Sequence, residues 1–280
     1  MSALRASQPK PLGRGSANIA NGASRNPEKT MLKREYRKYG RCYVDGEGKE
    51  YPGVTSILNI LDKNLGWWQM NEMGKAVITK THDALRGKRL LNMEEIVKES
   101  KKAADEYRDM KGAQGTRIHK IIEKRLNNED ISDPRQKDAK LSAIMFQIEK
   151  WINDNKIEPV LVEAYLLSRE HGYAGAVDLV ARHDSPKHGK QLILVDMKTG
   201  RSLQQEHTWQ MAAYAKAYEE MYSEPIDMAF ILHVDYENQI VKEERHLHKK
   251  DIPDEFNNFL RVYGAFKARN AKLLKGVQAQ

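Results

Sequence analysis

Hydrophobic residues in the first half of the chain recur mainly at helical spacing. The exception is a short hairpin predicted over Tyr39–Pro52, because the Asp45-Gly46 step readily adopts the positive backbone angles of a tight turn. Beyond this hairpin, apolar side chains repeat every three or four positions until Gly112 and Gly115 interrupt the pattern. The spacing predicts helices over residues 55–86, 93–110, 116–126 and 134–155.

After Pro159 the hydrophobic pattern changes to the alternation that is typical of strands. Strands are predicted over residues 160–168, 173–182, 191–196, 228–235 and 239–246, and helices over 203–222 and 252–274. The order is helices, three strands, a helix, two strands and a final helix. It predicts an α/β fold with a central mixed β-sheet flanked by helices, and an N-terminal helical section attached to it.

Residues 1–27 differ from the rest of the chain in composition. They contain Arg5, Lys10, Arg14 and Arg25, no acidic residue, and many Ser, Gly and Pro residues. This composition predicts a disordered basic tail. An organellar transit peptide is the alternative, although its amphipathic helix would be interrupted by prolines and glycines.

The charge of the chain favours a polyanionic partner, since 47 Lys+Arg against 39 Asp+Glu give a formal charge of +8. No apolar run approaches the roughly 18 residues that a membrane span needs, and the chain starts without a secretory h-region. The single cysteine, Cys42, excludes an intramolecular disulfide, a cysteine-rich zinc site and a four-thiolate iron–sulfur cluster. Any metal must therefore be held by oxygen or imidazole ligands.

The strand that ends at Lys198 brings ionisable groups to one point. Asp196 and Lys198 point to the same face because side chains alternate along a strand. A hairpin connection would place Asp178 of the preceding strand beside Asp196. Two converging carboxylates repel each other unless a cation lies between them. This arrangement indicates a bound divalent metal, for which the backbone carbonyl of Met197 is a further available ligand.

Each of these signals has a simpler interpretation when it is taken alone. An Asp-X-Lys triplet is commonly a solvated strand end, but Asp196 terminates an apolar strand, where ionisable groups cluster at functional sites. His119 and Glu123 share one helical face, as many surface pairs do. Gln210 and Tyr214 also share one face of their helix, but Tyr214 belongs to the apolar stripe of that helix, which is typical of a residue packed in the core.

Together these motifs resemble the RecB-like branch of the PD-(D/E)XK nuclease superfamily. The likeness lies in Gly-X-X-X-His-X-X-X-Glu over 115–123, the strand glutamate Glu163, Gly-X-X-Asp over 175–178, Asp-X-Lys over 196–198 and Gln-X-X-X-Tyr over 210–214. Residues 51–58 are similar to the entry segment of phage-type exonucleases and of the mitochondrial genome maintenance exonuclease. The resemblance covers roughly residues 51–222, and with Cys42 alone the chain would belong to the type without an iron–sulfur cluster.

The resemblance implies a restriction-endonuclease-like core and a role for each motif residue. His119, Asp178 and Asp196 would bind Mg²⁺ or Mn²⁺, and Lys198 would assist the attacking water. Such an ion generates hydroxide near neutral pH and neutralises charge at phosphorus. Gln210 and Tyr214 would support the site or the DNA, and Glu123 and Glu163 would lie around the metal ligands as supporting groups.

The helical section is where we expect the DNA to be held. Thr55 and Ser56 at a helix start offer hydroxyls and backbone amides to a phosphate. Trp67 and Trp68 are candidates for stacking on unpaired bases. Adjacent helical residues diverge by about 100°, so we expect one ring in the core and one available. The predicted organisation is a tail (1–27), a hairpin and helical DNA-gripping section (28–112) and a nuclease core (113–280).

The sequence thus predicts a metal-dependent DNA exonuclease that acts on single strands or DNA ends in replication, recombination or repair. A structure-selective endonuclease is the alternative among enzymes. A non-catalytic nucleic-acid-binding subunit is the alternative from another class, and the filled motif positions argue against it. A zinc hydrolase is disfavoured because His-rich ligand sets do not occur. A bacterial or phage origin would place the protein in the cytoplasm, and a transit peptide would place it in mitochondria.

Overall fold

The computed structural model describes residues 32–61, 65–87, 92–129, 138–187, 189–200 and 202–275. The predicted tail lies outside these residues, so its structure and the compartment that it implies stay predictions. Among the described helices, none combines the length and apolar character that crossing a bilayer requires.

A five-stranded sheet forms the centre of the protein, in the order β4-β5-β6-β7-β8. Its strands are β4 (Glu158–Ser168), β5 (Tyr173–Ser185), β6 (Gly189–Lys198), β7 (Met228–Asp235) and β8 (Ile240–His248). Neighbouring strands are antiparallel except β6 and β7, which run parallel because the helix α6 (Gln205–Tyr222) connects them. The predicted α/β fold with a mixed sheet is confirmed.

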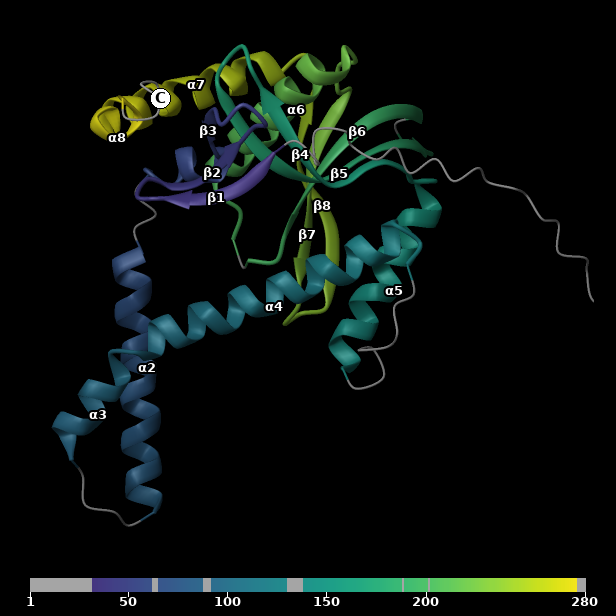
Figure 1. The fold of residues 1–280 in the computed structure, drawn as a ribbon. Coiled ribbons are helices and arrows are strands. Elements are labelled where there is room, and N and C mark those ends of the chain that lie inside the picture. Colours follow the sequence, from purple (N-terminus) through teal and green to yellow (C-terminus); the bar gives the residue numbers. More distant parts are fainter. Residues whose placement is uncertain are drawn as a thin grey trace, which may run out of the picture.

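Helices cover both faces of this sheet (Figure 1). On β6, Leu192 and Leu194 pack with α6, α7 (Ile252–Arg269) and α1 (Val54–Leu58). The alternate residues Ile193 and Val195 pack with α4 (Ala103–Leu126) and α5 (Ala139–Asp154). Because side chains alternate along β6, the protein has two hydrophobic cores, one on each face of the sheet. The predicted helix over 252–274 is divided at Asn270, after which α8 (Ala271–Lys275) begins.

The N-terminal strands form a small sheet of their own, in the order β1 (Lys33–Arg37), β2 (Gly40–Val44) and β3 (Glu50–Pro52). The predicted turn joins β2 to β3. Its Asp45 carboxylate accepts hydrogen bonds from the backbone N–H groups of Glu47 and Lys49, and Gly48 has a φ of 83°. Strand β1 was not predicted, because its sequence is almost entirely polar and charged.

The helices α2 (Leu65–Arg86) and α3 (Met93–Ser100) stand out from the sheet beside the first turns of α4 (Figure 1). We call these helices and residues 103–112 of α4 the helical extension. The predicted interruption at Gly112 and Gly115 is wrong, since α4 continues through both. A Cβ at position 115 would lie 2.7 Å from Thr199 Oγ1, so Gly115 permits close packing of α4 on the end of β6. The predicted section boundary after residue 112 thus falls inside one helix.

Candidate active site

Two aspartates lie side by side where β5 and β6 meet. Leu179 pairs with Val195, and Asp178 and Asp196 are the next residues in this antiparallel register. The Asp178 Oδ2 atom accepts a 2.6 Å hydrogen bond from the backbone N–H of Met197. The hairpin therefore brings Asp178 to the strand end that carries Asp196 and Lys198, as the sequence predicted.

Three side chains from three elements gather at this point. His119 Nδ1 of α4 lies 3.6 Å from Asp178 Oδ1 and 3.8 Å from Glu163 Oε1 of β4. Two atoms that bind one Mg²⁺-sized ion at about 2.1 Å lie no more than about 4.2 Å apart, so these separations fit shared coordination. Each side chain is partly accessible, with 26%, 15% and 27% of its surface exposed for His119, Asp178 and Glu163. The donor set of one imidazole and two carboxylates fits a divalent metal.

Glu163 reaches this group through an unusual backbone conformation. Its φ is 46°, in the left-handed region, although it lies within β4. Its flanking residues pair with those that flank Asp178, as Val162 with Leu179 and Ala164 with Val177. Non-glycine residues adopt such angles at a cost of order 1–3 kcal/mol, and they cluster at functional sites. The sequence analysis gave Glu163 a supporting role, whereas the geometry places it among the candidate metal ligands.

Asp196 is not one of the three clustered ligand candidates, and it forms an ion pair with Lys198. Its Oδ2 atom lies 2.5 Å from Lys198 Nζ, and its side chain is only 3% exposed. The pair emerges on one face of the strand end, as the alternation predicted. Metal ligation by Asp196 and by the carbonyl of Met197 stays a prediction.

The carboxylates of Asp178 and Glu163 favour positive charge at the position between them. Burial alone would lower the pKa of His119, but Asp178 and Glu163 outweigh it and raise this pKa to about 10. Burial opposes ionisation of Asp178, yet His119, Lys198 and the Met197 N–H together lower its pKa. Burial and the charge of Asp178 raise the pKa of Asp196 to about 6, against the influence of Lys198.

The predicted pair on α6 is buried against β5, and its supporting role at the site stays a prediction. Gln210 Nε2 donates a 3.0 Å hydrogen bond to the hydroxyl of Tyr214, and both side chains are buried. A Cβ at Gly175 would lie 2.4 Å from the ring of Tyr214. The glycine of the Gly-X-X-Asp motif is therefore needed so that this ring can pack against the β5 backbone that leads to Asp178.

The remaining predicted residues have different outcomes. Ser56 is buried, and its Oγ accepts a hydrogen bond from the Arg41 backbone N–H, so its hydroxyl serves the fold. Thr55 lies half-buried in α1, and phosphate binding by this residue stays a prediction. The side chains of Trp67 and Trp68 lie outside the described part of the structure. Glu123 lies one turn beyond His119 on α4, outside the group of three candidate ligands.

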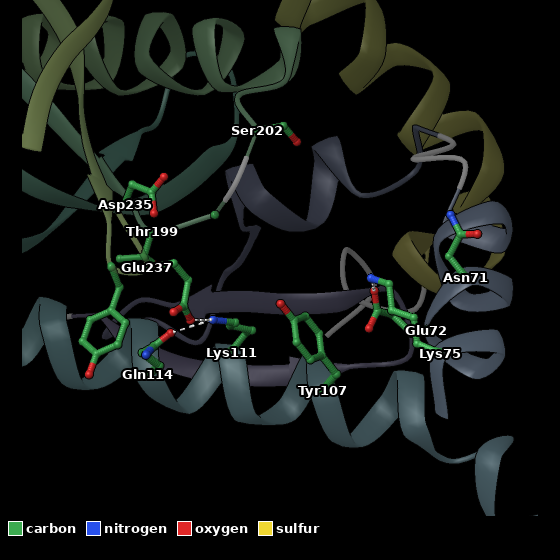
Figure 2. A pocket seen from close by; sticks show the side chains of 12 residues that line it. Asn71, Glu72, Lys75, Tyr107, Lys111, Gln114, Thr199, Ser202, Asp235 and Glu237 are labelled. Atoms are coloured by element: carbon green, nitrogen blue, oxygen red, sulfur yellow. Dashed lines mark hydrogen bonds and ion pairs between the residues drawn. The ribbon is translucent and has the colours of Figure 1, made fainter. Parts of the chain in front are cut away.

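A pocket of about 460 Å³ lies where the helical extension faces the strand ends. Figure 2 shows Tyr107 and Lys111 of α4 rising into it opposite Thr199, which directly follows Lys198. Lys111 Nζ lies 2.5 Å from Glu237 in the turn after β7. The sequence analysis missed these lining residues, because only the fold brings the elements together.

The comparison with known families matches residues 82–274 to the PD-(D/E)XK nuclease superfamily. No curated protein matches the chain. Among solved structures, a protein from Eubacterium rectale that is provisionally named an exonuclease is similar at 8% identity, with a TM-score of 0.35 over 54% of this chain and 68% of that one. The family match covers more than half of the chain and includes the His119, Glu163, Asp178 and Lys198 positions. The chain belongs to the PD-(D/E)XK nuclease superfamily, whose members use divalent metals to cleave nucleic acids.

Proposed function

We propose that the protein is a metal-dependent deoxyribonuclease of the RecB-like branch, which degrades single-stranded DNA from a free end. The observation that carries the proposal is the gathering of His119, Glu163 and Asp178 beside the Asp196–Lys198 ion pair. A binding module would need no such convergence of ligands and a cation at one strand end.

The chemistry is phosphodiester hydrolysis. A water oxygen attacks phosphorus, the bond from phosphorus to a sugar oxygen breaks, and that oxygen takes up a proton. A divalent ion held by the three ligands supplies activation of the water and neutralisation of the developing charge. The Lys198 ammonium stabilises negative charge on the attacking oxygen or on the phosphate, and Asp196 holds it in place.

The pocket in Figure 2 is our candidate for the path of the strand. It lies between the helical extension and the core, so a strand that occupies it has the extension on one side and the sheet on the other. Lys75 and Lys111 line it and offer positive charge to the DNA backbone. We propose that a single strand enters by its end and that Trp67 or Trp68 stacks on its bases.

The test is digestion of end-labelled linear and covalently closed circular single-stranded DNA of the same sequence. Linear DNA should be consumed with Mg²⁺ or Mn²⁺ and left intact with a chelator, and circles should resist under the same conditions. Asp178→Asn provides the inactive control. Circles cut as fast as linear strands would favour the endonuclease alternative. Binding of DNA without cleavage under any metal condition would favour the non-catalytic alternative.

A further inference from the structure

His233 is a buried histidine to which the proposed hydrolysis gives no role. It pairs with Lys198 in the parallel register of β6 and β7. Paired residues of adjacent strands project to the same face, so the imidazole stands beside the Lys198 side chain. The residue is only 6% exposed.

The ring of His233 holds the backbone that follows Lys198. Its Nε2 atom lies 2.6 Å from the carbonyl oxygen of Gly200. Because a carbonyl oxygen only accepts, Nε2 carries a proton and donates it to this bond. The other ring nitrogen lies 3.4 Å from Glu244 Oε1, and Glu244 is ion-paired with Lys242. The imidazole is therefore fixed on both sides.

The same turn is held from the opposite side by α4. The Thr199 Oγ1 atom lies 2.7 Å from where a Cβ of residue 115 would be, so the turn packs directly on the Gly115 backbone. His119, a candidate metal ligand, follows one turn later on this helix. The Thr199–Gly200 turn thus lies between the helix that carries His119 and the strand that carries His233.

We propose that His233 is a positioning residue for catalysis. By holding the Gly200 carbonyl, it fixes the end of β6 and hence the position of Lys198 relative to His119 and the other ligands. A displacement of about 1 Å at a catalytic group can cost on the order of a hundredfold in rate. The inference rests on the proposed nuclease function, which makes Lys198 the group to be positioned.

The first test compares His233→Leu with His233→Gln. Leucine fills the site but donates no hydrogen bond, so kcat on linear single-stranded DNA should fall by about tenfold or more, while KM changes by less than about twofold. The side-chain amide of glutamine can place a donor near the position of Nε2, so His233→Gln should recover most of kcat. His183→Leu is the matched control: it removes a buried histidine of the same sheet, opposite Gln191 at the start of β6, and should leave kcat unchanged.

A double-mutant comparison asks whether His233 acts through Lys198. In a Lys198→Met background, His233→Leu should cause no further loss of kcat, because the group that it positions is already absent. If the fold-losses in kcat of the two single variants multiply in the double variant, His233 acts independently of Lys198 and the proposal is overturned. Equal kcat for His233→Leu and wild type would also overturn it, as would a His233→Gln variant as slow as His233→Leu.

Amide hydrogen exchange gives a readout that does not need activity. Exchange over residues 197–200 should quicken in His233→Leu and return towards the wild-type rate in His233→Gln. Gly115→Ala disturbs the turn from the α4 side, so it should also quicken this exchange and lower kcat. A wild-type protein that cleaves no DNA would overturn the proposed function. Unchanged exchange in His233→Leu would overturn the positioning role separately.

Discussion

The backbone N–H of Met197 donates a 2.6 Å hydrogen bond to Oδ2 of Asp178, which leaves Oδ1 of the same carboxylate 3.6 Å from His119. One oxygen thus ties β5 to β6 and the other faces the candidate metal group. The position of Asp178 is set by the sheet itself, without a contribution from a flexible loop. Structural and catalytic roles of this residue can therefore be separated by substitution.

Asp178→Asn and Asp178→Ala should both abolish cleavage, because each removes a carboxylate ligand. Asparagine can still accept the Met197 hydrogen bond, whereas alanine leaves that N–H without its acceptor. We expect the alanine variant to be less stable than the asparagine variant by about 1 kcal/mol. Thermal unfolding measures the difference, and a gel shift should show that both variants still bind DNA. Wild-type turnover by Asp178→Asn would exclude this carboxylate from the mechanism.

The succession of strands along the chain and the adjacency of Asp178 and Asp196 could be predicted, because strand alternation and hairpin pairing are local properties of the sequence. The position of the Glu163 side chain beside His119 and Asp178 could not be predicted, since it depends on a backbone φ of 46° within a strand. The continuity of α4 through Gly115 was also missed, because this glycine makes room for Thr199, which is distant in sequence, and does not end the helix.

His233 carried a weak signal in the sequence, as the one polar residue among the first seven of the strand Met228–Asp235. Nothing local showed that this strand pairs in parallel with β6 at Lys198, because a parallel partner is brought into place by the crossover through α6. Pairing register is a property of the whole sheet. For that reason the Asp-X-Lys motif was recognisable from the sequence, and the proposed positioning residue His233 was not.

The metal requirement should follow the three gathered ligands. Mn²⁺ should support activity at least as well as Mg²⁺, because imidazole suits transition metals better than magnesium. Glu163→Gln weakens the donor set and should raise the metal concentration for half-maximal activity by about tenfold or more. Glu158→Gln alters an exposed glutamate at the start of β4 and is the matched control. A titration of activity against each metal distinguishes the variants, and an unchanged requirement in Glu163→Gln would remove it from the ligand set.

Lys198→Met should lower kcat much more than it raises KM. The ammonium acts on the attacking water or the transition state, so its loss should appear in turnover. Single-turnover cleavage with saturating enzyme isolates this step from product release. If affinity falls while turnover is unchanged, Lys198 is a phosphate contact and the proposed chemistry needs another cation.

Stability at acidic pH should depend on Asp138 at the start of α5. Burial opposes ionisation of this carboxylate, but hydrogen bonds from the Leu141 N–H and the Tyr236 hydroxyl, with the charge of Arg117, lower its pKa. Since the folded pKa lies below the unfolded value, the stabilisation is present above about pH 4 and is lost as the pH falls through the folded pKa.

Asp138→Ala should therefore destabilise the protein by about 1 kcal/mol at pH 7, the usual cost of a lost helix cap, and by less near pH 3. Thermal or denaturant unfolding across this range measures the difference. Asp154→Asn, at the exposed end of the same helix, should have little effect at any of these pH values. A constant difference between Asp138→Ala and wild type across the range would show that the charge of Asp138 contributes nothing.

Glu237 should restrain DNA binding at the pocket. Its carboxylate lies 2.5 Å from Lys111 of α4 and 2.6 Å from Lys140 of α5, so two ammonium groups from different helices meet on one anion. A DNA phosphate that uses these lysines must displace Glu237, and such exposed ion pairs are weak enough to exchange. Glu237→Gln should therefore tighten single-strand binding several-fold at low salt. It should also steepen the dependence of log Kd on log salt concentration by about 0.7 for each lysine that gains a phosphate contact.

Lys111→Met should weaken single-strand binding and flatten its salt dependence. The matched control is Glu149→Gln, which breaks the ion pair between Glu149 of α5 and Arg125 of α4. Fluorescence anisotropy across a salt series measures all three variants. If Glu237→Gln binds no more tightly than wild type, Glu237 only ties the turn after β7 to the two helices, and the strand takes another path past Lys198.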